Sequence, residues 1–152
     1  MRMSQVARGR LSAIIGTVLV VGALPAVANT FAVFPDTPGG NFAAWNWSIA
    51  VDSGGPTANP TLIVMTGQTY SFIVNTSGLH PFYIDQAPGL GGTNPYPVGP
   101  ALSANAVESP TTITMNLPAD APETLYYACG LHEQMNGTIT VVHDLVFRSN
   151  FE

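Results

Sequence analysis

The stretch LYYACGLHEQMNGTITV, residues 125–141, contains two strand-like runs joined by a short loop with the only cysteine of the chain at its start. The first run ends at Cys129, and the second, GTITVV, alternates polar and apolar residues. Alternation with a period of two is typical of a half-buried β-strand. His132 follows Cys129 by three positions, and Met135 follows His132 by three. The sequence therefore predicts a thiol, an imidazole and a thioether between two strands.

Other short runs upstream have the same strand-like character and are separated by clusters of Gly, Pro and Asn. Several short strands with such turn signals, and no intervening stretch of helical period, favour an antiparallel β-sandwich or barrel. The runs are WNWSIAV (45–51), TLIVMTGQTYSFIVN (61–75) with a turn or bulge at Gly67, HPFYI (80–84) and TTITMNL (111–117).

The first 28 residues have the pattern of a secretory signal peptide. Three arginines precede an apolar run, residues 11–24, and the small-residue site Ala26-Val27-Ala28 follows it. The run is shorter than the roughly 20 residues of a membrane span, although an uncleaved anchor is the alternative. We therefore predict a leader (1–28), one β domain (29–143) and a tail (144–152), which is either a frayed end or a sorting signal.

The charge of the chain limits the classes of partner. Beyond the leader, Arg148 is the only basic residue against nine acids, so residues 29–152 have a formal charge of −8. Such a surface argues strongly against nucleic acid and anionic membranes as partners, because nothing would neutralise their phosphates. A basic protein partner, a neutral apolar contact, or acids that only maintain solubility all stay open.

A lone cysteine in an exported protein indicates an intermolecular bridge, a reactive thiol or a metal ligand. Thiolate, imidazole and thioether together suit copper, whereas zinc would favour two cysteines or two further histidines. A second imidazole must come from His80 or His143. We favour His80 because it opens a short apolar strand after a turn, and we expect His143, beside Asp144, to be solvated. Haem is excluded because its attachment motif needs a second cysteine.

The set His80, Cys129, His132 and Met135 resembles the type 1 copper site of the cupredoxins, the plastocyanin and amicyanin family. The C-x-x-H-x-x-M spacing is similar to the short ligand loop of amicyanin. The resemblance covers roughly residues 31–142, with its specific motifs in 61–142. It implies an all-β, cupredoxin-like Greek-key β-sandwich of eight strands that binds one copper ion. By the same resemblance, Cys129 would bind as a thiolate, His80 and His132 as neutral imidazoles, and Met135 as a weak axial ligand.

The resemblance also implies a function. The chain would be a monomeric electron carrier in the periplasm or outside the cell, and not an enzyme. Electrons would leave through His132 at an apolar patch that docks protein redox partners. Leu131 would supply this patch, with Pro81, Phe82 and the Gly- and Pro-rich connection as further candidates. A copper oxidase is disfavoured because a trinuclear centre takes many histidines and this chain has three. The alternatives are a copper-binding or storage protein, a surface-interaction module with this fold, and a nonmetal binding sandwich.

Two departures from the family pattern lead to further expectations. Pro81 has no N–H to donate to the cysteine sulfur, which predicts a lower reduction potential. Gly130-Leu131 stands where a proline commonly stiffens the ligand loop. Separately, the Pro- and Gly-rich connection 86–110 follows His80 closely, so we expect it to lie over that end of the sandwich. Tyr126 and Tyr127 are expected in the core or at its rim.

Overall fold

The computed structural model describes residues 29–36, 46–76 and 80–143. The predicted leader and tail, and Trp45, lie outside these ranges. Nine strands and no helix occur within them, so no described helix could cross a membrane. The strands are β1 (Asn29–Asp36), β2 (Asn46–Val51), β3 (Thr57–Ala58), β4 (Leu62–Met65), β5 (Thr69–Val74), β6 (Phe82–Asp85), β7 (Thr111–Asn116), β8 (Thr124–Cys129) and β9 (Asn136–Val142).

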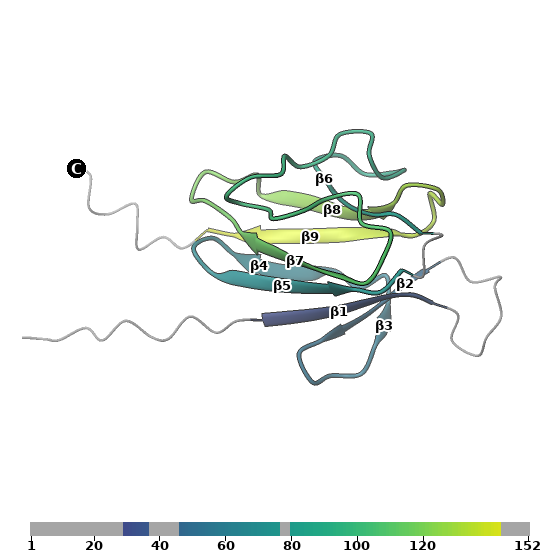
Figure 1. Ribbon diagram of the computed structural model, residues 1–152. Coiled ribbons are helices and arrows are strands. Elements are labelled where there is room, and N and C mark those ends of the chain that lie inside the picture. Colours follow the sequence, from purple (N-terminus) through teal and green to yellow (C-terminus); the bar gives the residue numbers. More distant parts are fainter. Residues whose placement is uncertain (1–28, 37–45, 77–79, 144–152) are drawn as a thin grey trace, which may run out of the picture.

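The strands form two sheets that pack as a β-sandwich (Figure 1). One sheet has the order β3-β2-β1-β5-β7 and the other the order β4-β9-β8-β6. The predicted all-β sandwich is confirmed, but its sheets are not purely antiparallel. β1 pairs with β5, and β4 with β9, in parallel. Parallel neighbours cannot be joined by a tight hairpin, so each of these pairs connects distant parts of the chain.

The core lies between the two sheets and follows the predicted alternation. On β5, Tyr70, Phe72 and Val74 are buried, as are Ile113 and Met115 on β7. The turn at Gly67 is also confirmed, since this residue has a φ of 76°. On β2 the alternation holds only in part. Val51, the last residue of the strand, is exposed at the surface of the sandwich.

The strand β1 was not predicted. Its sequence NTFAVFPD follows the predicted leader directly, so no turn signal marks where the strand begins. It also contains a proline, which weakens the strand pattern. Phe31 and Val33 nevertheless face the core, and β1 lies between β2 and β5 at the centre of its sheet. The two-residue strand β3 brings the described total to nine, where the family resemblance implies eight.

Part of the connection 86–110 lies against the end of the sandwich that carries Cys129, as expected, and the rest continues along the side of the sandwich to β7 (Figure 1). Near Cys129, the Gly91 N–H donates to the Cys129 carbonyl. Farther along, Val107 forms a bridge with Phe82, and Leu102 forms one with Met115 of β7. The connection therefore joins the edge strands β6 and β7 of the two sheets.

Candidate metal centre

Three predicted metal ligands converge at one end of the sandwich. His80 lies just before β6, Cys129 is the last residue of β8, and His132 lies in the loop between β8 and β9. Their ligand atoms all lie within 4.8 Å of one another. The two Nδ1 atoms are 3.1 Å apart, and the Cys129 Sγ lies 3.8 Å from the His80 Nδ1 and 3.6 Å from the His132 Nδ1.

These separations fit three donors around one ion. Metal bonds to imidazole nitrogen and thiolate sulfur are roughly 2.0 to 2.3 Å long, so donors that share an ion lie about 3 to 4 Å apart. Each histidine directs the same ring atom, Nδ1, toward the sulfur. The arrangement of the three side chains therefore suits a metal ion at their centre.

Backbone hydrogen bonds hold the segments that carry these donors. Phe82 pairs with Cys129 across β6 and β8, and the Gly130 N–H donates to the Pro81 carbonyl at 2.9 Å. This ladder holds Pro81, which follows His80, next to Gly130, which follows Cys129. Residues 130–135, the loop between β8 and β9, form the ligand loop. This loop closes on itself, because the Cys129 N–H donates to the Met135 carbonyl at 2.8 Å.

Met135 and His143, the other two residues considered, have different places. Met135 is buried at the end of the ligand loop, and its N–H donates to the His132 carbonyl at 3.0 Å. It is thus tied to the loop that carries the imidazole. His143 lies beyond β9, where its Nδ1 is 2.9 Å from the Ala119 carbonyl, and it is not part of the donor cluster.

The two mixed sheets, the separate histidine before β6 and the cysteine-histidine loop before the last strand together form the arrangement that the family resemblance implies. This is a cupredoxin-like sandwich. No protein-family model matches the sequence, and no curated protein matches it significantly.

Solved cupredoxin structures are similar to this chain. The copper protein rusticyanin has 26% identity and a TM-score of 0.46, over 74% of this chain and 76% of that one. Another structure of rusticyanin, from Thiobacillus ferrooxidans, has 28% identity and a TM-score of 0.45, over 74% and 75%. A purple cupredoxin from Nitrosopumilus maritimus has 12% identity and a TM-score of 0.42, over 72% and 97%.

The interior beside the donors of this cupredoxin-like sandwich is aromatic. Trp47, which is fully buried, approaches the His80 ring edge-on at 6.4 Å between centroids and the Phe82 ring at 5.1 Å. The His80 and His132 rings are 4.8 Å apart. This packing restricts the imidazole of His80 and keeps water from its inner side.

Burial changes the protonation of two donors. It raises the pKa of the Cys129 thiol, which the backbone N–H groups of Leu131 and His132 lower by smaller amounts. Burial, and then the nearby His132, lower the pKa of His80. Both shifts favour the uncharged side chain in the metal-free protein. A metal ion therefore has to displace the proton of the thiol when it binds.

The sulfur accepts hydrogen bonds from the ligand loop itself. The Leu131 N–H lies 3.4 Å from the Cys129 Sγ. Pro81 has no N–H, as the sequence indicated, but a residue of the loop supplies a donor in its place. The absence of a proline at position 131 is what makes this bond possible.

The expected apolar patch is only partly present. Leu131 is 63% exposed, whereas Pro81 and Phe82 are buried and do not reach the surface. Phe82 faces the core because its pairing with Cys129 sets which side of β6 faces inward. Tyr127 is buried and Tyr126 half-buried, as the sequence predicted for a core or rim position.

Sequence reasoning missed two polar residues that support the site. Asn59 donates from Nδ2 to the Gln134 carbonyl of the ligand loop at 3.1 Å. Asp85 accepts the Gly92 N–H at 2.8 Å, next to the glycine that contacts Cys129. The only local signal for Asn59 is its position before a proline in a turn-rich segment, and Asp85 had none.

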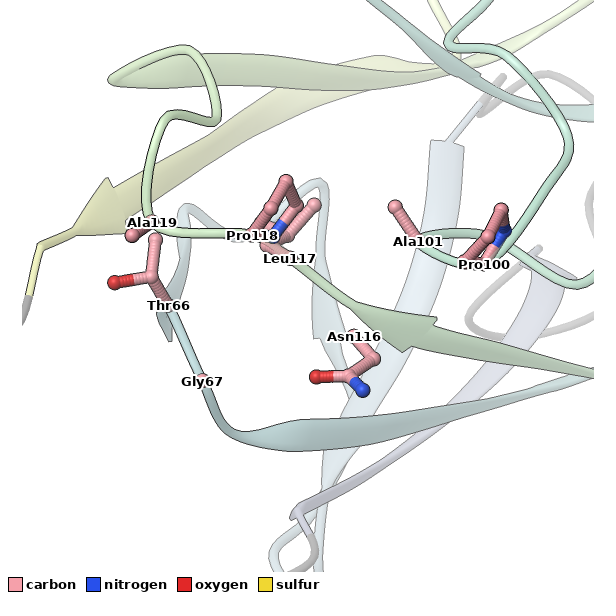
Figure 2. A pocket seen from close by; sticks show the side chains of 8 residues that line it. All are labelled: Thr66, Gly67, Pro100, Ala101, Asn116, Leu117, Pro118 and Ala119. Carbon is pink, nitrogen blue, oxygen red and sulfur yellow. The ribbon is translucent and has the colours of Figure 1, made fainter.

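A hollow of about 560 Å³ lies away from the donors (Figure 2). Thr66 and Gly67 from the β4–β5 turn, Asn116 and Pro118 from the end of β7, and Pro100 from the long connection line it. None of its lining residues is a histidine, cysteine, aspartate or glutamate. The thiol and the imidazoles that suit copper therefore lie in the donor cluster and not around the hollow.

Proposed function

We propose that this chain is an exported type 1 copper protein that carries single electrons between protein partners. The observation that carries the proposal is the convergence of one thiol and two imidazole Nδ1 atoms within 4.8 Å. A His₂Cys set with a weak thioether ligand is typical of copper sites for electron transfer. In this proposal His80, Cys129 and His132 hold the metal, and Met135 is the weak axial ligand.

Copper would supply the one-electron couple, and the chain would supply a rigid set of ligands. The β6–β8 ladder and the closed ligand loop hold the donors, and Trp47 restricts the His80 ring from inside. A site that barely moves when its charge changes exchanges electrons with little rearrangement. We further propose that partners dock beside His132 at exposed Leu131.

Absorption and EPR spectra of the Cu(II)-loaded protein test this function. We expect an intense thiolate-to-copper absorption band and a narrow copper hyperfine splitting, both lost in Cys129→Ser because a hydroxyl is a much poorer copper ligand. A matched Ser103→Ala variant, changed at an exposed position on the connection, should keep both signals. A pale wild-type spectrum, or one that does not depend on Cys129, would contradict the proposed ligand set.

Voltammetry separates electron transfer from storage. A fast and reversible one-electron couple is expected for a carrier. A chain that binds copper tightly but gives no reversible couple would be a storage or surface-interaction module, which is the other function considered for this site.

The hydrogen bond from Leu131 predicts how the potential is tuned. Leu131→Pro removes the N–H that donates to Cys129 Sγ, leaving more electron density on the sulfur to stabilise Cu(II). If the bond contributes about 1 kcal/mol to the difference between oxidation states, the potential falls on the order of 40 mV. Leu131→Ala retains the N–H and should leave the potential unchanged in voltammetry. Equal shifts in the two variants would instead assign the effect to the leucine side chain.

The same reasoning applies to Pro81. Pro81→Ala introduces an N–H next to His80, and we expect the potential to rise because this group adds a donor for the cysteine sulfur. An unchanged potential in voltammetry would overturn the idea that the missing N–H at position 81 lowers the potential.

A further inference from the structure

A segment of the long connection folds back over the residue that carries the thiol. The Gly91 N–H donates to the Cys129 carbonyl at 2.9 Å. On its other side, the Cys129 N–H donates to the Met135 carbonyl. Both backbone polar groups of Cys129 are therefore engaged, which fixes the direction in which its side chain leaves β8.

This close approach requires a residue without a side chain at position 91. A Cβ on Gly91 would lie 2.9 Å from the Tyr83 ring and 3.0 Å from the carbonyl carbon and oxygen of Cys129. Such distances are shorter than van der Waals contact, so a larger residue would push the segment away. The half-buried Tyr83 ring thus packs between this segment and Gly130, which follows Cys129.

Asp85 contacts the same segment of the long connection through a hydrogen bond to Gly92. Its side chain is fully buried at the end of β6, and its Oδ2 accepts the Gly92 N–H at 2.8 Å. Its Oδ1 is buried without a hydrogen-bond partner in the described ranges. A buried carboxyl group is costly, and this one makes its single side-chain bond to the residue next to Gly91.

We propose that Asp85 is a positioning residue for the metal centre. Through Gly92 and Gly91 it keeps the Cys129 carbonyl engaged and so keeps the thiol directed at the two imidazoles. The inference rests on the proposed copper function for its metal-dependent part. The contacts from Asp85 to Gly92 and from Gly91 to Cys129 exist without metal and can be tested without it.

The experiment compares Asp85→Ala, Asp85→Asn and Asp52→Ala in the full chain. Asn retains an oxygen that can accept the Gly92 N–H. Asp52 is the matched control, because its Oδ1 also accepts a backbone N–H at 2.8 Å, from Thr30 at the start of β1. Two quantities are measured: amide hydrogen exchange at Gly91 and Gly92 in the metal-free protein, and Cu(II) affinity in competition with a chelator.

In Asp85→Ala we expect faster exchange at both glycines and roughly 10- to 100-fold weaker Cu(II) binding, as for the loss of other groups that orient metal ligands. Asp85→Asn should restore both quantities to within a few-fold of wild type, and Asp52→Ala should change neither. A merely structural role for Asp85 would lower the stability without changing glycine exchange or copper affinity, and this result would overturn the proposal.

A second pair of variants covers the case in which Asp85→Ala does not fold. Gly91→Ala should weaken Cu(II) binding by a similar factor, whereas Gly99→Ala, whose Cβ would meet nothing within 4 Å, should not. Unchanged affinity in Gly91→Ala would overturn the inference. If wild type itself lacked a thiolate-to-copper band, the proposed function would fail, and glycine exchange in Asp85→Ala would still decide for or against the positioning contact.

Discussion

Replacing Gly137 with alanine should lower the free energy of unfolding by about 3 to 5 kcal/mol. Gly137 lies directly opposite Tyr127 in the β8–β9 pair, and the Tyr127 ring packs over it so closely that a Cβ would overlap the ring. The ring is fully buried and its hydroxyl donates to the Pro60 carbonyl at 2.5 Å. An alanine therefore displaces a core aromatic and also breaks its hydrogen bond. Urea unfolding at equilibrium measures the effect.

Two controls separate these contributions. Gly55→Ala adds a methyl group where nothing lies within 4 Å, and should leave the unfolding midpoint unchanged. Tyr127→Phe removes only the hydroxyl and should cost about 1 to 2 kcal/mol. If Gly137→Ala and Gly55→Ala unfolded at the same urea concentration, the packing of Tyr127 on Gly137 would not be the constraint we infer.

The second large effect is expected in Asn59→Asp, which should cost about 2 to 3 kcal/mol and speed the release of copper. The Asn59 Oδ1 accepts the Trp47 N–H, and its Nδ2 donates to the Asn46 side chain and to the Gln134 carbonyl. Aspartate keeps the first bond and tolerates the positive φ of this position, 40°. It replaces both donations with an oxygen that faces two other oxygens, which loosens the ligand loop from β2.

Asn105→Asp is the matched control for this loop contact. Asn105 Oδ1 accepts the backbone N–H groups of Ile84 and of its neighbour Ala106, and its Nδ2 donates to two carbonyls, those of Ile84 and Tyr96, but its hydrogen bonds do not include the ligand loop. Both variants should lose similar stability in urea, and only Asn59→Asp should release copper faster to a chelator. Equal release rates would show that the Gln134 contact does not matter for metal retention.

The strands that could be predicted are those with a clear period of two. In β5 and β7 every second residue is apolar and a glycine or proline marks a neighbouring turn, so their inward faces were predicted residue by residue. The strand β1 could not be separated from the segment before it, and its parallel pairing with β5 has no local signature. The side of β6 that faces the core depends on its register with β8, which explains the error at Phe82.

The candidate site was predictable to a similar degree. The spacing of Cys129, His132 and Met135 is local, and few histidines remain to complete the set, so the three donors that converge were all proposed from the sequence. The supporting contacts were not. Asn59 and Gln134 are 75 residues apart, and the contact of Asp85 depends on how a long irregular connection folds. Such partners are chosen by the tertiary structure and leave no pattern in the chain.

The parallel pairing of β4 with β9 also determines when this protein can fold. Among the described strands, the only neighbour of β4 in its sheet is β9, whose pairing residues 139–142 lie far downstream of β4 in the sequence. The second sheet therefore cannot be completed until β9 has been synthesised and has left the ribosome. Contacts of such large sequence separation make folding slow, on the scale of milliseconds to seconds. Because the ligand loop lies directly between β8 and β9, the strand that completes the second sheet is also the strand that closes the loop carrying Cys129 and His132.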